Sequence, residues 1–292
     1  MVRIKEKVIE GALFICSFFT VLITLGIILI LASETLNFFS EVSIIEFFTG
    51  TEWTPLFENK KFGILPLVCG TLLVTFIAIL VALPLGLTIA VYLNEYAHKK
   101  FTAVIKPLLE ILAAIPTVVY GFFALTFVTP LLQQVIPNLS GFNALSAGLV
   151  MGVMIIPYIS SLSEDALRAV PNSLREAAYG MGSTRLQTSF KVMIPAASSG
   201  IIVSIILAIS RAIGETMIVA IAAGQEPKLT LNPFTSLETI TTYIVQVSMG
   251  DVPRNSIEYS TIFSAGITLF VFTFLLNTIS FWIKRKFHQK YE

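Results

Sequence analysis

Long runs of apolar residues, separated by short polar stretches, dominate this chain. Six such runs occur, at residues 11–32, 63–93, 104–135, 144–162, 199–223 and 262–283. A helix needs roughly 20 apolar residues to cross a hydrocarbon core about 30 Å thick, and each run approaches or exceeds that length. The pattern therefore predicts an all-α transmembrane fold in which six helices cross a bilayer.

The composition agrees with lipid as the solvent. Hydrophobic residues make up 55% of the chain and charged residues 13%, and the mean hydropathy is +0.84. Soluble domains usually carry about 25% charged residues, so this chain has too few to cover a globule in water. A net charge of +1 provides no overall field to attract nucleic acid. Membrane lipid is therefore an expected partner, and nucleic acid is not.

The first apolar run follows three basic residues, Arg3, Lys5 and Lys7. A cleaved signal peptide begins in the same way, but its apolar region spans only about 7–15 residues. Because the run at 11–32 is longer, we expect a retained first transmembrane helix. Cys16 and Cys69 lie within apolar runs, where a free thiol packs as a small hydrophobe. No metal site is expected.

Prolines interrupt the second and third runs. They occur at Pro66, Pro84, Pro107, Pro116 and Pro130. Each proline removes a backbone donor and bends a helix, which a bilayer tolerates where neighbouring helices satisfy the freed carbonyls. Both runs are therefore expected to be kinked or partly broken.

The distribution of Lys and Arg predicts the orientation, because basic residues concentrate in cytoplasmic loops. With the N-terminus inside, 14 basic residues lie in cytoplasmic segments: Arg3, Lys5, Lys7, Lys99, Lys100, Lys106, Arg168, Arg175, Arg185, Lys191, Lys284, Arg285, Lys286 and Lys290. Only four lie outside: Lys60, Lys61, Lys228 and Arg254. We therefore expect both termini in the cytoplasm and an even number of spans.

The longest polar stretch on the cytoplasmic side is the loop 164–198. Ser173 and Glu176 have the spacing of a capping box, and Gly182 suits the end of a helix. Ser183 or Thr184 can cap a second helix that runs toward Met193. The pattern predicts two short helices joined at a glycine corner, although capping alone is equally compatible with an ordinary solvated loop.

A longer pattern in this loop resembles the EAA motif of ABC-importer permeases. Glu176, Ala177 and Ala178 are followed after three residues by Gly182, and after nine more by the segment 192–195 (Val-Met-Ile-Pro). The resemblance implies a type I permease domain whose loop forms a coupling helix that docks into an ATPase subunit. It assigns the docking role to Glu176, Ala177, Ala178 and Gly182.

The same resemblance explains an absence. The chain contains no G-x-x-x-x-G-K-[ST] phosphate loop, so ATP is expected on separate ATPase subunits and no cofactor on this chain. The rival hypothesis is an intramembrane enzyme. It is disfavoured because His98 and His288 lie in cytoplasmic segments and no H-E-x-x-H or G-x-S-x-G motif occurs. We expect a transport subunit, not an enzyme.

Two charged residues lie within the fifth run. A charge at the centre of a membrane helix costs about 2.5–3.5 kcal/mol on insertion scales, and the spacing of Arg211 and Glu215 places them on one helix face. One hypothesis is a structural ion pair between them. The other is a polar lining of a translocation path, in which the guanidinium faces an oxyanion. Elsewhere, Glu110 is expected to form a surface ion pair with Lys106.

The segment 210–216 (Ser-Arg-Ala-Ile-Gly-Glu-Thr) resembles the corresponding segment of phosphate-specific (Pst) permeases, with Ser210 in place of the usual glycine. Segments 62–66, 92–97 and 113–121 resemble the C-type subunit of that system. The resemblance implies a substrate pathway lined by Arg211, Glu215 and Thr216. The alternatives are an A-type phosphate permease and a permease for another oxyanion, such as molybdate or phosphonate.

The resemblance also implies the organisation of the whole system. Residues 1–292 are expected to form one permease domain, with a peripheral first helix and outside loop at 1–61 and a core at 62–292. The expected partners are a second, homologous permease subunit in a heterodimer, two ATPase subunits, an extracytoplasmic phosphate-binding protein and inorganic phosphate. The expected location is the cytoplasmic (inner) membrane of a bacterium or archaeon.

Overall fold

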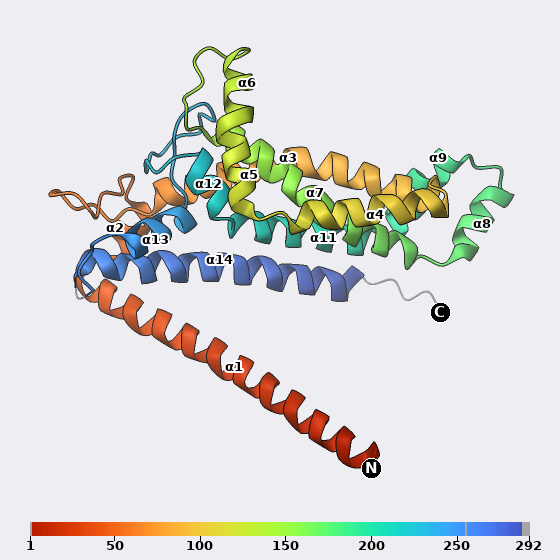
Figure 1. The fold of residues 1–292 in the computed structure, drawn as a ribbon, viewed down its shortest axis with the longest axis horizontal. Helices are drawn as coiled ribbons and strands as arrows, with labels where there is room; N and C mark the ends of the chain where they lie inside the picture. The colour runs from red at the N-terminus through yellow and green to blue at the C-terminus, as the bar shows by residue number, and fades with distance from the viewer. Residues whose placement is uncertain (1, 255, 288–292) are drawn as a thin grey trace.

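Helices account for nearly all the regular structure in this computed structural model, which describes residues 2–254 and 256–287 (Figure 1). Within those residues the only β-pairing is an isolated bridge between Trp53 and Phe62. His288 and Lys290, assigned above to a cytoplasmic tail, lie outside the described residues. The prediction of an all-α fold is confirmed.

Within the described part of the chain, four helices are long and apolar enough to cross a membrane. They are α1 (Val2–Glu41), α3 (Leu65–Glu95), α7 (Ala144–Arg168) and α14 (Ile257–Phe287). Two bent helix pairs pass the same test, which brings the total to as many as six if each pair is one span. This agrees with the six apolar runs in the sequence.

The third run is broken, as its prolines predict. Helix α4 (Lys99–Ala114) stops before Pro116, and the chain then turns by 85° into a second stretch, Thr117–Gln133. That stretch comprises α5 (Thr117–Phe123), the π-helical η1 (Ala124–Val128) and α6 (Thr129–Gln133). A residue before proline is driven out of the α region, and Ile115 accordingly has an extended ψ of 130°.

The second run, in contrast, does not break. Helix α3 continues through Pro84 to Glu95, so of the two forms expected, kinked or partly broken, the broken one is wrong. The physical reason is packing. α3 lies against α7, where glycines allow close approach: a Cβ at Gly148 would lie 2.7 Å from Cβ of Ile77, and one at Gly152 would lie 2.9 Å from the main-chain oxygen of Ala78. Small residues at such interfaces hold membrane helices together.

The fifth run forms two helices. Helix α11 (Ser198–Ile213) is followed, after a three-residue break, by α12 (Met217–Ala222). The stretch Arg185–Ala196 precedes α11 and is bent by 73° relative to it. It comprises α9 (Arg185–Thr188), the π-helical η2 (Ser189–Met193) and α10 (Ile194–Ala196).

Helix α1 stands apart from the core. Its apolar stretch is not buried within the chain. It packs on α14 near their shared end and diverges from it toward the N-terminus (Figure 1). Its exposed side chains include Leu13, Phe14 and Leu29, which suit contact with lipid or another subunit.

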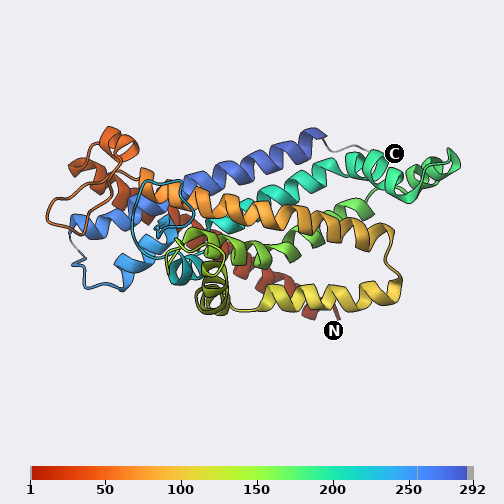
Figure 2. The same cartoon turned by 90° about the horizontal axis from the view of Figure 1, so that it is seen from above.

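The molecule has two structurally different ends (Figures 1 and 2). One end carries α2 (Ile44–Thr49), the loops 50–64 and 224–239, and α13 (Ile240–Met249). The opposite end carries α8 (Asn172–Gly180) and α9. The break at residues 214–216 lies between these ends, where α11 meets α12.

Candidate translocation and coupling site

The helix break at residues 214–216 separates two residues that the sequence places one helical turn apart. α11 ends at Ile213, and Gly214 is its C-terminal cap, donating to Ser210 O over 3.3 Å. Glu215 N donates to Ala212 O over 3.2 Å, which closes a tight turn. The i, i+4 geometry of a continuous helix therefore does not apply to Arg211 and Glu215.

Arg211 lies in the last turn of α11 and is exposed on the surface of the chain. Its Cζ lies 5.5 Å from the centre of the Tyr158 ring on α7, within the range of a cation–π interaction. Among the described residues, no carboxylate oxygen lies within 4.0 Å of its guanidinium nitrogens. Its donors therefore point to a surface where a ligand or another subunit can meet them.

Glu215 is buried, with 8% of its surface exposed. Its Oε1 lies 3.5 Å from the main-chain nitrogen of Ile218, in the first turn of α12, and its main-chain oxygen accepts from Thr241 Oγ1 over 2.8 Å. The ion pair with Arg211 that one of the two hypotheses requires is therefore absent from this conformation. The chain turns at Gly214, so the carboxylate faces α12 and not the guanidinium.

Thr216 is the residue immediately before α12 and is half-buried. Its hydroxyl donates to Gly214 O over 3.5 Å. Arg211, Gly214 and Met217 are all exposed, whereas Glu215 is not. Of the three predicted pathway residues, only Arg211 is openly presented at the surface.

A cavity of about 370 Å³ lies between α4 and α7. The ring of Tyr158, which Arg211 faces, is part of its lining. Tyr158, Lys106, Glu110 and Glu164 are among its lining residues. Lys106 Nζ lies 2.8 Å from Glu164, which also pairs with Arg168 at 2.8 Å. The expected pair between Lys106 and Glu110 is thus wrong. Glu164, 1% exposed, offers Lys106 a buried partner, and sequence spacing cannot show that α7 lies beside α4.

The loop 164–198 contains the two short helices that its pattern predicts. The first differs in detail, because α8 begins at Asn172 after Pro171, and Ser173 lies inside the helix. The predicted Ser173–Glu176 capping box is therefore wrong, since the extended backbone of Pro171 starts the helix without it. The second helix is capped by Thr184, whose capping box with Gln187 has distances of 3.3 and 3.0 Å.

The glycine corner is confirmed at Gly182, which has a φ of +83°. Ser183 N donates to Ala178 O over 3.0 Å, and Gly182 N donates to Tyr179 O over 2.9 Å. These two bonds form a Schellman motif, which needs a left-handed residue at this position. A Cβ on Gly182 would meet nothing within 4 Å, so backbone conformation, not crowding within the chain, calls for glycine.

The corner presents an apolar surface. Met181 is 87% exposed and Leu186 59% exposed, and they flank the glycine. Glu176 and Ala177 are exposed on α8, whereas Ala178 is buried. Exposed apolar groups beside exposed small residues are typical of a protein interface.

Sequence reasoning missed an ion pair that joins this loop to the membrane core. Arg175 on α8 lies 2.7 Å from Oε1 of Glu95, at the end of α3, and Asn94 donates to the same oxygen over 2.9 Å. The side chain of Glu95 is 2% exposed. In the sequence, Glu95 lies in the segment 92–97, which was noted only because it resembles Pst permeases. Arg175 is 80 positions away, and no local spacing pattern connects residues so far apart.

A membrane domain of broken apolar helices with an exposed EAA-type loop defines the class of ABC-importer permeases. The profile of the family described as "Binding-protein-dependent transport system inner membrane component" matches residues 82–292. The chain belongs to this family.

Curated relatives narrow the comparison. The chain is 37% identical to the "Probable ABC transporter permease protein YqgH" of Bacillus subtilis, over 89% of this chain and 84% of that protein. It is 34% identical to the "Phosphate transport system permease protein PstC" of Mesorhizobium japonicum, over 80% and 76%. It is 31% identical to a "Probable phosphate transport system permease protein PstC" of Methanocaldococcus jannaschii, over 82% of each. The resemblance noted from the sequence is confirmed.

Solved structures agree on the fold. A bacterial alginate ABC transporter, in complex with an alginate pentasaccharide-bound periplasmic protein, superposes with a TM-score of 0.65 at 17% identity, over 97% of this chain and 96% of that one. The MetNI methionine ABC transporter in an inward-facing conformation gives a TM-score of 0.56 at 18% identity, over 77% and 94%. The type I permease fold is therefore confirmed.

Proposed function

We propose that this chain is the C-type, membrane-spanning permease subunit of an ATP-driven importer of inorganic phosphate. The names of its PstC relatives suggest the substrate. The observation that carries the proposal is Arg211, an arginine at a helix break, exposed and without a carboxylate partner in the described chain.

The chemistry of Arg211 suits an oxyanion. Guanidinium presents five N–H donors in a planar fork that matches two oxygens of phosphate. Tyr158 supports the guanidinium from below, and the buried carboxylate of Glu215 faces α12. The positive charge is therefore not cancelled by its nearest acidic neighbour in sequence. Glu215 and Thr216 shape the turn that presents Arg211.

The subunit works in a larger assembly. A second, homologous permease covers the face that carries Arg211, so that the path lies between the two subunits. Two ATPase subunits dock on α8 and the Gly182 corner and bind the ATP, while this chain carries no cofactor. An extracytoplasmic phosphate-binding protein delivers substrate at the end that carries α13. Residues 62–292 form the core of the domain, and 1–61 form its peripheral part.

The assembly lies in the cytoplasmic membrane of a bacterium or archaeon with both termini of this chain in the cytoplasm, as the distribution of basic residues favours. Closure of the ATPases on ATP moves α8 and α9, and the path opens outward. Hydrolysis returns it to the inward-facing state. In this cycle Arg211 holds the anion between the two openings.

Uptake of labelled phosphate into proteoliposomes that contain the complete complex tests the proposal. We expect ATP-dependent uptake that excess sulfate or molybdate does not abolish. Arg211→Gln should remove it, whereas Arg254→Gln, a change at an exposed arginine in the loop before α14, should not. Uptake of molybdate in preference to phosphate would refute the assignment of substrate.

A further inference from the structure

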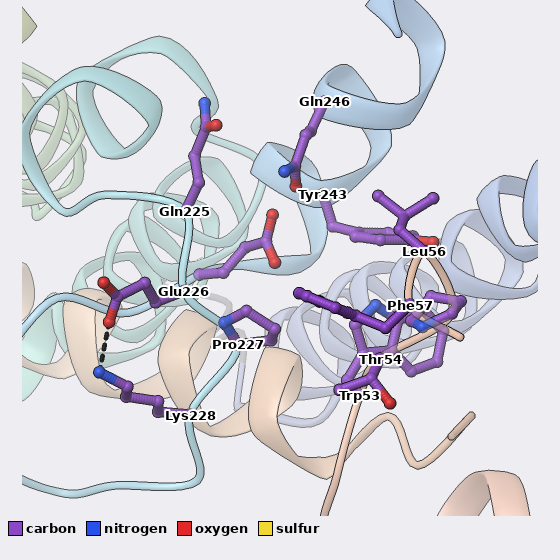
Figure 3. Close-up of a pocket in the computed structure, with 12 residues that line it drawn as sticks. Trp53, Thr54, Leu56, Phe57, Gln225, Glu226, Pro227, Lys228, Tyr243 and Gln246 are labelled. Atoms are coloured by element: carbon purple, nitrogen blue, oxygen red, sulfur yellow. Dashed lines mark hydrogen bonds and ion pairs between the residues drawn. The ribbon is translucent and has the colours of Figure 1, made fainter. Parts of the chain in front are cut away.

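A cavity of about 450 Å³ lies at the end of the molecule opposite the coupling loop. Three segments build it: the loop 50–64, the loop 224–239 and helix α13 (Figure 3). Its walls are largely apolar, from Trp53, Pro55, Leu56, Phe57, Pro227 and Tyr243. Gln225 and Gln246 add two amide groups. None of the sites described above includes this cavity.

The cavity contains a carboxyl oxygen that receives no hydrogen bond from the described residues. Glu238 lines it and is 1% exposed, and its Oε1 is buried without a hydrogen bond. Nε1 of Trp53, another lining residue, is also buried, and its neighbour is the hydroxyl of Tyr243. Burial raises the pKa of Glu238 to about 8. Unsatisfied buried polar groups are uncommon in native proteins and call for an explanation.

The fold holds Glu238 in place from behind. Its main-chain oxygen packs so closely on Gly70 of α3 that a Cβ there would collide with it. The next residues are tied down as well, because Ile240 N donates to Thr71 Oγ1 over 3.1 Å. The carboxyl group therefore cannot reach a partner elsewhere in the chain by a small shift of its backbone.

The lysines of this end of the molecule are already paired. Lys60 pairs with Glu258, Lys61 with Glu52 at 3.6 Å, and Lys228 with Glu226. Figure 3 shows the pair between Glu226 and Lys228 at the edge of the cavity, away from Tyr243. Arg254, the arginine in the loop before α14, forms no ion pair with Glu238 either, so among the described residues no cation meets this carboxyl group and the place is open to a cation from another molecule.

The lining determines which ligand fits. In its ionised form, a buried carboxylate repels an oxyanion such as phosphate, whereas a cation bound beside it gains an ion pair in a weakly screened site. Apolar and aromatic walls suit a chain of methylene groups behind the charge, and the amide groups of Gln225 and Gln246 suit a neighbouring peptide bond. This combination describes a lysine side chain on a polypeptide.

We propose that this cavity receives a lysine side chain of an extracytoplasmic partner protein, with Glu238 as its counter-ion. The inference rests on the proposed function for the side of the membrane that the cavity faces and for the existence of that partner. The site is also connected to the candidate pathway. Thr241, three residues after Glu238, donates to the main-chain oxygen of Glu215 over 2.8 Å. A lysine bound in the cavity can therefore affect the position of the helix break at residues 214–216 through this hydrogen bond.

Fluorine NMR of the assembled complex tests the site directly. The complex is labelled with 5-fluorotryptophan, and Trp53→Phe identifies the resonance of Trp53. N-acetyl-lysine amide should shift this resonance, and the isosteric Glu238→Gln should abolish the shift. Glu52→Gln, at an exposed ion pair whose residues do not line the cavity, is the matched control and should retain it. Co-purification of the subunits shows that each variant assembles.

N-acetyl-norleucine amide has a similar apolar side chain without the ammonium group, so it shows whether binding depends on the charge or only on the apolar fit. A shift as large as that with lysine amide, or a lysine shift that persists in Glu238→Gln, would overturn the cation site. The purified phosphate-binding protein tests the partner: its affinity for the complex should fall about tenfold in Glu238→Gln, which corresponds to about 1.4 kcal/mol, and not in Glu52→Gln. Unchanged affinity in Glu238→Gln would overturn the assignment to that protein. So would a shift of the Trp53 resonance by ethanolamine equal to that by lysine amide, because any small amine would then fill the site.

These outcomes do not depend on transport. Loss of phosphate specificity in the uptake assay would refute the proposed function and leave a lysine-dependent shift of Trp53 unaffected. Conversely, phosphate uptake with no effect of lysine amide on Trp53 would refute the cation site alone.

Discussion

Arg175 on α8 lies 2.7 Å from the buried carboxylate of Glu95, at the end of α3. α3 in turn packs along α7, which carries Tyr158 beneath Arg211. The pair thus connects the loop on which the ATPases are proposed to act with the helices around the candidate pathway. Motion of α8 can therefore be transmitted to α3 through a specific contact.

Removal of the charge in Arg175→Gln should uncouple ATP hydrolysis from transport. It leaves a buried carboxylate unpaired, a change that is strongly destabilising at buried ion pairs, and we expect phosphate uptake per ATP hydrolysed to fall about tenfold or more. The exchange Arg175→Glu with Glu95→Arg should restore part of it. The control is Arg185→Gln, at an exposed residue of the same loop. Equal coupling ratios in Arg175→Gln and wild type would exclude this role.

Gly182→Ala should weaken coupling while Gly180→Ala does not. Gly182 has a left-handed φ of +83°, where an L-residue costs about 1–2 kcal/mol. Gly180 lacks that constraint, and a Cβ on either residue meets nothing within 4 Å. ATPase stimulation and uptake are measured for both variants, and Gly182→Asp should have the largest effect. If both alanine variants behave alike, the backbone conformation at Gly182 is not required.

Arg211→Gln should abolish uptake without preventing assembly, and Arg211→Lys should restore only part of it, because an ammonium lacks the planar fork. The double change Arg211→Gln with Glu215→Gln should remain inactive, since the two side chains are not paired in this structure. Initial rates of uptake measure each effect. Recovery of activity in the double variant would point to a structural ion pair in another state of the cycle.

A single cysteine at position 182 should react with a membrane-impermeant maleimide only after cells are opened, whereas one at position 58 should react in intact cells. Both residues are exposed, so accessibility depends on the side of the membrane. The background must lack Cys16 and Cys69, which are free thiols. Labelling of position 182 in intact cells would reverse the proposed orientation.

Binding of lysine amide near Trp53 should strengthen as pH rises from about 6 to 9. The pKa of Glu238 is raised to about 8 by burial, so the carboxyl group becomes a counter-ion only as pH passes through that value, while the lysine ammonium stays charged. The surrounding titratable and charged groups are Tyr243 on α13, Glu226 and Lys228 in the loop, and Glu258 with Lys60. In Glu238→Gln, fluorine NMR titrations should show no such dependence.

Much of the architecture was predictable because it depends on local patterns. Apolar length identified the spans, and Pro116 identified the break in the third run. Helices often end at a residue with positive φ, which glycine adopts most easily, and this preference correctly predicted the corner at Gly182. Pro84 did not break α3, because its effect depends on how tightly a neighbouring helix packs, which no local pattern contains.

The site was predictable in its residues but not in its contacts. The sequence by itself identified Arg211 and the loop around Gly182 as candidate functional residues and lipid as the surroundings of the chain. Composition and short-range spacing suffice for these conclusions. Only the tertiary structure decided that Arg211 faces Tyr158 and that Glu238 is buried with a carboxyl oxygen that the described residues leave without a hydrogen bond. It also decided the two ion pairs, between Lys106 and Glu164 and between Arg175 and Glu95. Each depends on which helices become neighbours or where the chain turns, and helix packing determines this over distances that sequence periodicity does not report.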